Sequence, residues 1–369
     1  MSRCKLEEFI SYEQPSKYIV DSDQYDDSYE TPVLTAGKSF ILGYTDEKNN
    51  IFDNLPVIIF DDFTTSVQFV DFPFKVKSSA MKLLKNTEQA DIKYCYYLLK
   101  FLQHTPENHK RQWLSATSQN IVELPTIEKQ KSIVRKLDKI LEVIDNQNKQ
   151  LKLLDEAIKA RFVEMFGDPR INDKKWKTGK IVDYFEVKGG KRIPKGMGYA
   201  ERKTNHPYLR ASDMKNATIL DDDIHYIDEE VYKRIKRYTV NAHDIYLTNV
   251  GVNLGMAGVI PKKYDGANLT ENAVKLVPKD KILLNGMFLS YYINSPGIQH
   301  YINERKMSVG VPKLAIFRIE SMPLLLPPLE LQNQFASFVE EIDKSRSRIQ
   351  KSLEASQELF DSLMQEYFG

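Results

Sequence analysis

The feature that most constrains this chain is a long heptad-patterned stretch that occurs twice. Residues 127–167 end in Met-Phe-Gly, and residues 329–369 end in Tyr-Phe-Gly. The two stretches align without a gap at an offset of 202 residues, which places Leu124-Pro125 on Leu326-Pro327. Each stretch follows a longer segment of globular composition. The chain is therefore organised as domain, long helix, domain, long helix, and it has an internal pseudo-twofold.

The apolar residues of both stretches recur about every 3.5 residues, which is the period of a supercoiled helical seam. A single helix of about 60 Å, at about 1.5 Å per residue, cannot bury such a stripe alone. We therefore expect the two helices to pack against each other as an antiparallel coiled-coil spacer. The residues predicted to form this seam are Ile133, Leu137, Ile140, Ile144, Leu151, Leu154 and Ile158 in the first helix, and Phe335, Val339, Ile342, Ile349, Leu353, Phe360 and Leu363 in the second.

Polar residues also occupy the predicted seam. The heptad places Gln130 and Gln332 at its first position in the two helices. Polar residues interrupt the middle of each seam, Gln147 in the first helix and Arg346 with Ser356 in the second. Buried polar seam residues cost stability but fix register and partner. They predict that the two helices pair in one defined register.

The two globular segments repeat more weakly and predict an α+β fold, with several short strands first and helices late. Thr31 to Ala36 resembles His206 to Ala211, and residues 72–76 match residues 273–277 in pattern. A Tyr- and Leu-rich helix follows in each segment. We expect four parts: globular domains over 1–123 and 169–325, and long helices over 124–168 and 326–369.

Charge is distributed unevenly between the two domains. Residues 170–325 carry 26 Lys and Arg against 17 Asp and Glu, whereas residues 1–120 carry 13 against 17. The second domain has the electrostatics of a phosphate binder. Cys4 and Cys95 show no metal-ligand spacing, and no apolar run approaches the roughly 20 residues of a membrane span. These features predict a cytoplasmic protein with no membrane association.

Motifs for catalysis are missing. The segment around Gly189-Gly190-Lys191 lacks the spacing of a phosphate-binding loop, because Phe185 stands at the first Gly position and Arg192 follows the Lys. The six His residues form no close ligand pair, so no metal site is predicted. The Pro-Pro at 327–328 lacks the flanking residues of the amino-methyltransferase signature. We expect no catalytic residue and no cofactor bound by this chain.

Three groups of residues carry a family resemblance. They are Leu-Pro-x-x-Glu-x-Gln opening a helix that ends at Phe162 to Asp168, its second copy from Leu326 to Gly369, and the segments 189–196, 208–213 and 269–273. The chain resembles the specificity subunit of a type I restriction–modification enzyme, over almost its whole length. The match is specific in the helices and the second domain and weaker in the first domain.

The resemblance implies that each domain is a target-recognition domain that reads one half of a bipartite target in double-stranded DNA, with the helices setting the gap. It also implies a non-catalytic subunit of a bacterial defence complex. The partners would be two adenine-methyltransferase subunits and endonuclease/translocase subunits, with S-adenosylmethionine on the methyltransferase. One alternative is a coiled-coil assembly adaptor of two modules that binds no DNA. Another is a catalytic DNA methyltransferase fragment.

Candidate DNA contacts follow from side-chain chemistry. Lys and Arg contact phosphates, and Arg, Lys, Asn, Ser and Thr can read base edges. For any single Lys the alternative is a solvated surface charge. In the second domain the predicted contacts are Lys188, Lys191, Arg192, Lys195, Arg202, Lys203, Arg210, Asn249, Asn253, Arg305, Lys306 and Lys313. In the first domain they are Lys38, Thr64, Thr65, Lys75, Lys77, Ser78 and Ser79.

Overall fold

The computed structural model describes residues 2–37, 39–106, 111–279, 284–307 and 310–369. The chain forms two compact units, Met1–Lys149 with Gln350–Gly369, and Gln150–Ile349. Each unit holds one globular domain and a part of each long helix. The predicted four-part division therefore stays a prediction. In the described part of the chain, no helix is both long and apolar enough to cross a membrane.

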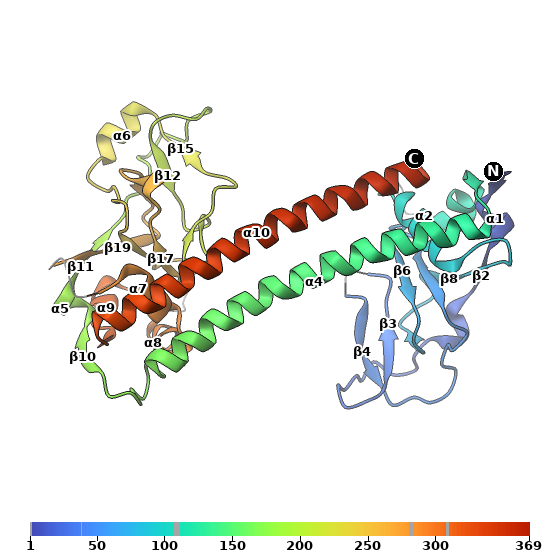
Figure 1. The fold of residues 1–369 in the computed structure, drawn as a ribbon, viewed down its shortest axis with the longest axis horizontal. Coiled ribbons are helices and arrows are strands. Elements are labelled where there is room, and N and C mark those ends of the chain that lie inside the picture. Colours follow the sequence, from blue (N-terminus) through green and yellow to red (C-terminus); the bar gives the residue numbers. More distant parts are fainter. Residues whose placement is uncertain (1, 38, 107–110, 280–283, 308–309) are drawn as a thin grey trace. The chain divides into compact units, whose positions relative to one another are not determined.

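The two long helices are α4 (Ile127–Phe166) and α10 (Leu329–Phe368), each 40 residues long (Figure 1). They run antiparallel in each unit. In the first unit, Gln147 Nε2 donates to Ser352 Oγ (2.8 Å) and Lys136 Nζ to Tyr367 OH (3.1 Å). In the second unit, Arg346 pairs with Asp155 at 2.7 Å, and the Phe162 ring meets the Phe335 ring. The antiparallel pairing predicted from the heptads is confirmed.

The first unit builds three small sheets beside a helix, and its fold is α+β as predicted. The two-stranded sheet is β1 (Ser2–Lys5) and β9 (Ile121–Leu124). The four-stranded sheet has the order β2 (Ile10–Glu13), β8 (Met81–Asn86), β5 (Val57–Asp61), β6 (Val67–Val70). The three-stranded sheet has the order β4 (Ile41–Thr45), β3 (Thr31–Leu34), β7 (Lys75–Val76). The helices are α1 (Leu6–Phe9), η1 (Pro15–Tyr18), α2 (Ile92–Phe101), α3 (Gln112–Ser115) and η2 (Thr117–Gln119).

The second unit repeats these sheets and adds to them. Its two-stranded sheet is β10 (Lys177–Lys180) and β20 (Pro323–Leu326). The four-stranded sheet is β11 (Phe185–Gly189), β19 (Ala273–Pro278), β16 (Ile245–Thr248), β17 (Ala257–Val259), and the three-stranded sheet is β15 (His225–Tyr226), β12 (Pro207–Leu209), β18 (Asn268–Leu269). An added hairpin is β13 (Met214–Lys215) and β14 (Thr218–Ile219). The helices are α5 (Ile181–Tyr184), α6 (Glu229–Ile235), η3 (Lys262–Tyr264), α7 (Gly286–Asn294), α8 (Pro296–Arg305) and α9 (Ile316–Glu320).

Strand pairing shows which segments correspond. Strand β7 pairs parallel with β3, and β18 pairs parallel with β12, so β7 corresponds to β18. Strand β8 pairs with β5 as β19 pairs with β16, so β8 corresponds to β19. The sequence match of residues 72–76 with residues 273–277 is therefore wrong. Strands β7 and β18 are only two residues long, too short to carry a recognisable pattern.

A buried glutamine fixes each domain to the start of its long helix. Gln130 Oε1 accepts from the backbone N–H of Asp91 (2.7 Å), and its Nε2 donates to the carbonyl of Pro125 (2.8 Å). Gln332 accepts from Asn285 N–H and donates to the Pro327 carbonyl, each at 2.8 Å. Asp91 and Asn285 are the N-caps of α2 and α7. The heptad pattern placed both glutamines in the seam between the helices. That placement is wrong, because their side-chain amides hydrogen-bond to the adjacent globular domain and the helix start.

The predicted seam residues lie in two environments. Those near the helix ends are buried in, or pack against, the cores of the domains, whereas Leu151, Leu154, Ile349 and Leu353 in the middle are half-buried. In the first unit the core contains Ile133, Leu137 and Phe360, with Ile140, Ile144 and Leu363 packed against it. In the second unit the core contains Ile158, Phe335 and Val339, with Ile342 packed against it.

Candidate nucleic-acid interface

Two adjoining cavities mark the candidate interface on the second unit. The first has a volume of about 630 Å³, and the second about 500 Å³. Both are lined by Arg192, Glu271 and Asn272. The first is also lined by Val250, Gly251, Met307, Val311 and Lys313. The second is also lined by Ile193, Met197, Gly198, Tyr199, Tyr208, Arg210, Ala211, Ser212 and Thr270.

An ion pair lies where the two cavities adjoin. Arg192 Nε donates to Glu271 Oε1 at 2.5 Å, and the Arg192 side chain remains 77% exposed. Burial alone would raise the pKa of the Glu271 carboxyl, but hydrogen bonds from Arg192 and Thr270 lower it below its usual value. Both groups are charged at neutral pH. The exposed guanidinium therefore keeps donors available to a phosphate or a base edge.

The loop that carries Arg192 is held on the segment containing Glu271. Lys191 N–H donates to the Leu269 carbonyl (2.8 Å), and Tyr208 OH donates to the Lys191 carbonyl (2.9 Å). A Cβ on Gly190 would come within 2.0 Å of the Thr270 carbonyl oxygen, so this close approach requires glycine. The glycine-rich segment positions cations by packing its backbone closely.

Arg210 lines the second cavity, but its guanidinium already has partners in the protein. It pairs with Asp213 at 2.6 Å and with Asp223 at 3.0 Å, and its side chain is 20% exposed. The hydrogen bond to Asp213 raises the pKa of Arg210, against the opposing effect of burial. These contacts favour a structural role for Arg210 in shaping the cavity wall.

The remaining predicted cations of the second domain differ in how they are engaged. Lys191, Lys195, Arg202 and Lys203 are exposed, and no described residue forms an ion pair with any of them. Lys313 is exposed and lines the first cavity with Arg192. Lys191 and Lys203 lie over the rings of Tyr238 and Tyr226, at 5.7 and 5.9 Å from the ring centroids. The others have acidic or amide partners. Lys188 pairs with Glu186 (2.8 Å), Arg305 with Glu304 (3.0 Å) over the Tyr301 ring, and Lys306 Nζ donates to Asn303 Oδ1.

The predicted amides lie on the turn between β16 and β17. Asn249 Oδ1 is buried without a hydrogen-bond partner among the described residues. Asn253 is half-buried, and its carbonyl accepts from Thr248 Oγ1. Neither residue is among those that line the two cavities, although Val250 and Gly251 between them are.

In the first unit the structure corrects two predicted contacts. The Lys75 side chain is 1% exposed and pairs with Glu47 at 2.5 Å, and Thr65 is 2% exposed and donates to the His104 carbonyl. Neither side chain is accessible to DNA, because the Lys75 ammonium is buried against Glu47 and the Asn49 carbonyl, and the Thr65 hydroxyl is buried against the His104 carbonyl. Lys77 pairs with Asp23. Thr64 and Ser78 are exposed, Ser79 is half-buried, and Lys38 lies outside the described residues.

Sequence reasoning missed several cavity residues. Asn272, Ser212 and Tyr199 line the second cavity, and Val311 lines the first. The predicted contacts were all cationic, amide or hydroxyl side chains, which excludes the aromatic Tyr199 and the apolar Val311. Asn272 sits inside the quoted segment 269–273, so its neighbours gave a signal. Val311 and Tyr199 had none, because their place depends on contacts distant in sequence.

Residues 173–357 match the family described as the type I restriction modification DNA specificity domain. The chain is 30% identical over 374 residues to the EcoR124I/EcoR124II specificity subunit of Escherichia coli, covering 96% of this chain and 89% of that protein. It is 22% identical to the EcoBI specificity subunit of Escherichia coli, over 63% of this chain and 53% of that protein.

Solved structures share the fold. The type I S subunit from M. genitalium superposes with a TM-score of 0.63 at 15% identity, covering 100% of this chain and 96% of that chain. A chain from a study of complex assembly in the type I R-M system gives 0.60 at 13% identity, covering 100% and 97%. These structural matches support the fold alone.

Proposed function

Because this chain belongs to the specificity subunits of type I restriction–modification enzymes, we propose that each of its two domains reads one half of a bipartite DNA target. The chain is a non-catalytic subunit, which sets aside the assembly adaptor and the methyltransferase fragment. The observation that carries the proposal is that the same three sheets occur twice with different surface loops. One scaffold with two surfaces suits a target of two unlike half-sites. The paired helices would set the gap between them.

The partners follow from the same premise. The internal repeat offers two equivalent attachment sites, which suits two copies of an adenine-methyltransferase subunit. Endonuclease/translocase subunits would join this assembly for cleavage. S-adenosylmethionine would be bound by the methyltransferase subunits, and the complex would act in the cytoplasm.

The proposed DNA surface of the second domain is centred on the two cavities. Lys191, Arg192, Lys195 and Lys313 would contact phosphates, since they are exposed cations on or beside the cavity walls. Arg202 and Lys203 would extend this set along the same loop. Asn272 and Ser212 carry the hydrogen-bonding groups that read base edges. Lys75 and Thr65 are removed from the proposed contacts of the first domain.

The test replaces Lys191, Arg192 and Lys195 together by Ala in the assembled methyltransferase. DNA affinity should fall, and the slope of log affinity against log salt should flatten by up to about 0.9 for each lost phosphate contact. The measurement is fluorescence anisotropy with a duplex containing the target, at several salt concentrations.

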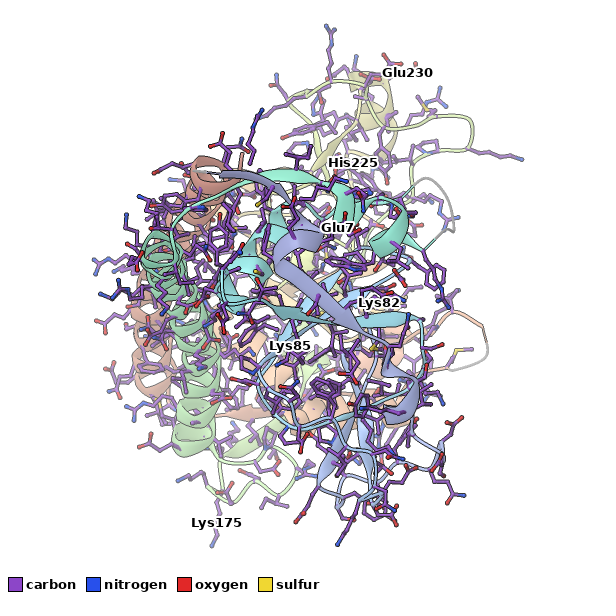
Figure 2. All side chains as sticks on the ribbon, turned by 90° about the vertical axis from the view of Figure 1, so that its right-hand side faces the viewer. Glu7, Lys82, Lys85, Lys175, His225 and Glu230 are labelled. Atoms are coloured by element: carbon purple, nitrogen blue, oxygen red, sulfur yellow. The ribbon has the colours of Figure 1, made fainter. Side chains whose placement is uncertain are left out.

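A matched control replaces Lys174, Lys175 and Lys177, which are exposed lysines of the same unit. Figure 2 shows Lys175 at the lower end of this unit, well below His225, whose ring nitrogen lies 3.2 Å from the Arg210 guanidinium. The control should keep the original slope. Equal slopes for the two triple variants would mean that the loop of Lys191 faces away from DNA.

A further inference from the structure

The turn between β16 and β17 presents a valine to solvent. Val252 is 98% exposed, the highest exposed fraction among the exposed large apolar residues of the described chain. Its neighbours Val250 and Gly251 line the first cavity, together with Val311 and Met307, which are 60% and 56% exposed. A single exposed valine would need no explanation, but Val252, Val311 and Met307 are three exposed apolar residues at one cavity with polar neighbours, and such groups mark interaction sites.

The backbone on both sides of Val252 is held in place. Gly251 has a φ of +104°, which favours glycine, and its N–H donates to the Pro312 carbonyl at 3.0 Å. On the other side the Asn253 carbonyl accepts from Thr248 Oγ1, and the Gly255 N–H donates to the Thr248 carbonyl. The Val252 side chain is therefore presented outward by a fixed turn.

The corresponding turn of the first unit is shorter, and its exposed apolar residue, Phe63, is only 37% exposed. Phe60 pairs with Val67 across β5 and β6, which leaves the six residues 61–66 in the connection. Leu247 pairs with Ala257 across β16 and β17, which leaves the nine residues 248–256. The first domain folds without the extra three residues, so the fold does not require them. Residues 251–253 belong to the surface that distinguishes the second domain.

The surroundings of Val252 indicate what it meets. Lys313 and Arg192 line the cavity next to it, and both are exposed cations suited to phosphates. Between the phosphates of a duplex, the apolar group displayed in the major groove is the 5-methyl of thymine. We propose that Val252 reads the 5-methyl group of one thymine in the half-site of the second domain. This inference rests on the proposed function and adds a specificity-determining residue to it.

The experiment removes the methyl groups one at a time from the DNA. Each thymine of the second half-site, on either strand, is replaced by deoxyuridine, which keeps every hydrogen-bonding group. The assembled methyltransferase carrying the wild-type chain, Val252→Ala or Val182→Ala is titrated with each duplex. Val182 is a matched control, since it is an exposed valine of the same unit that lines neither cavity.

We expect one deoxyuridine position to weaken wild-type binding by about three- to fourfold, the size of one lost apolar methyl contact. The Val252→Ala complex should bind thymine and deoxyuridine duplexes equally at that position, and the Val182→Ala complex should behave as wild type. Wild-type binding that ignores every methyl, or Val252→Ala binding that keeps the discrimination, would overturn the proposal. A uniform loss on every duplex would also overturn it, because it would indicate a wedge between base steps.

A different result would contradict the proposed function itself. In that case the wild-type complex would bind the target duplex no better than a scrambled duplex of the same length. A wild-type complex that prefers the target duplex to the scrambled duplex but senses no thymine methyl group would reject only the role of Val252.

Discussion

The two globular domains share one scaffold but carry different side chains at one equivalent position, just after β5 in the first domain and just after β16 in the second. In the first domain Asp62 N–H donates to the Ala80 carbonyl, and the Asp62 carbonyl accepts from Gln112 N–H. In the second domain Asn249 N–H donates to the Asn272 carbonyl, and the Asn249 carbonyl accepts from Leu314 N–H. The backbone network is the same, so Asp62 and Asn249 are equivalent positions. What differs is the side chain placed there.

In the first domain a buried ion pair occupies this position. The Asp62 carboxylate accepts from the backbone N–H of Trp113 and pairs with Lys82 at 3.0 Å, and both charged side chains are 0% exposed. Strand register places Val274 of the second domain at the position of Lys82. There Asn249 Oδ1 is left buried without a partner among the described residues, beside the cavity wall formed by Val250 and Asn272. One scaffold can thus hold either a buried ion pair or, among the described residues, an unpaired buried amide oxygen at this position.

Breaking the ion pair should give the largest difference between the domains. Asp62→Ala should lower the free energy of unfolding of the first unit by about 3–5 kcal/mol, since it leaves Lys82 as an uncompensated buried charge. Asn249→Ala should cost the second unit about 1 kcal/mol or less, because it removes an acceptor that has no partner. The measurement is urea unfolding followed by tryptophan fluorescence.

The chain allows each unit to be followed separately, because its two tryptophans are Trp113 in the first unit and Trp176 in the second. Asp62→Ala is measured in a Trp176→Phe background and Asn249→Ala in a Trp113→Phe background. As a control, Asp62→Asn with Lys82→Val installs the residue types of the second domain and should recover most of the loss. Equal losses of unfolding free energy for Asp62→Ala and Asn249→Ala would contradict the proposed difference between these two positions.

Where the domains are alike, equal effects are expected. Gln130→Ala and Gln332→Ala should each cost about 1–3 kcal/mol, because each leaves a buried Pro carbonyl and the N–H of a helix cap unsatisfied. Unfolding in the same two tryptophan backgrounds measures this. Asn148→Ala in the first unit and Gln334→Ala in the second unit serve as exposed controls on the same helices. A loss of unfolding free energy in only one unit would show that the hydrogen bonds of Gln130 and Gln332 are not equivalent.

The helices and the repeat could be predicted because their signal is spread over 40 residues each. The role of Gln130 could not be predicted. Its heptad position suggests a contact with the other helix, whereas near the start of α4 that face of the helix packs against the globular domain. The burial of Lys75 depends on Glu47, which is 28 residues away on another segment. The pairing of Arg192 with Glu271 spans 79 residues. The local sequence identified the cations, but not the acidic residues that pair with them, because these lie far away in the sequence.

The smallest expected effects lie in the polar interruptions of the helix pair, where the units differ again. Gln147 is 9% exposed, its Nε2 donates to Ser352 Oγ, and its Oε1 is buried without a partner among the described residues. Arg346 pairs with Asp155, and the two side chains are 30% and 57% exposed, so that pair is partly solvated. Such exposed pairs contribute about 0–1 kcal/mol.

We therefore expect opposite signs. Gln147→Leu should raise the free energy of unfolding of the first unit by about 1 kcal/mol, because it removes a buried unsatisfied acceptor and adds apolar surface to the seam. Ser352 is exposed, so its hydroxyl can bond water instead. Arg346→Ala should lower that of the second unit by less than about 1 kcal/mol. Asn148→Leu, at an exposed neighbouring position, should change the first unit by less than about 0.5 kcal/mol. A destabilised Gln147→Leu variant would mean that the Gln147–Ser352 bond contributes more than burial of a leucine, and that the polar seam stabilises the first unit as well as fixing its register.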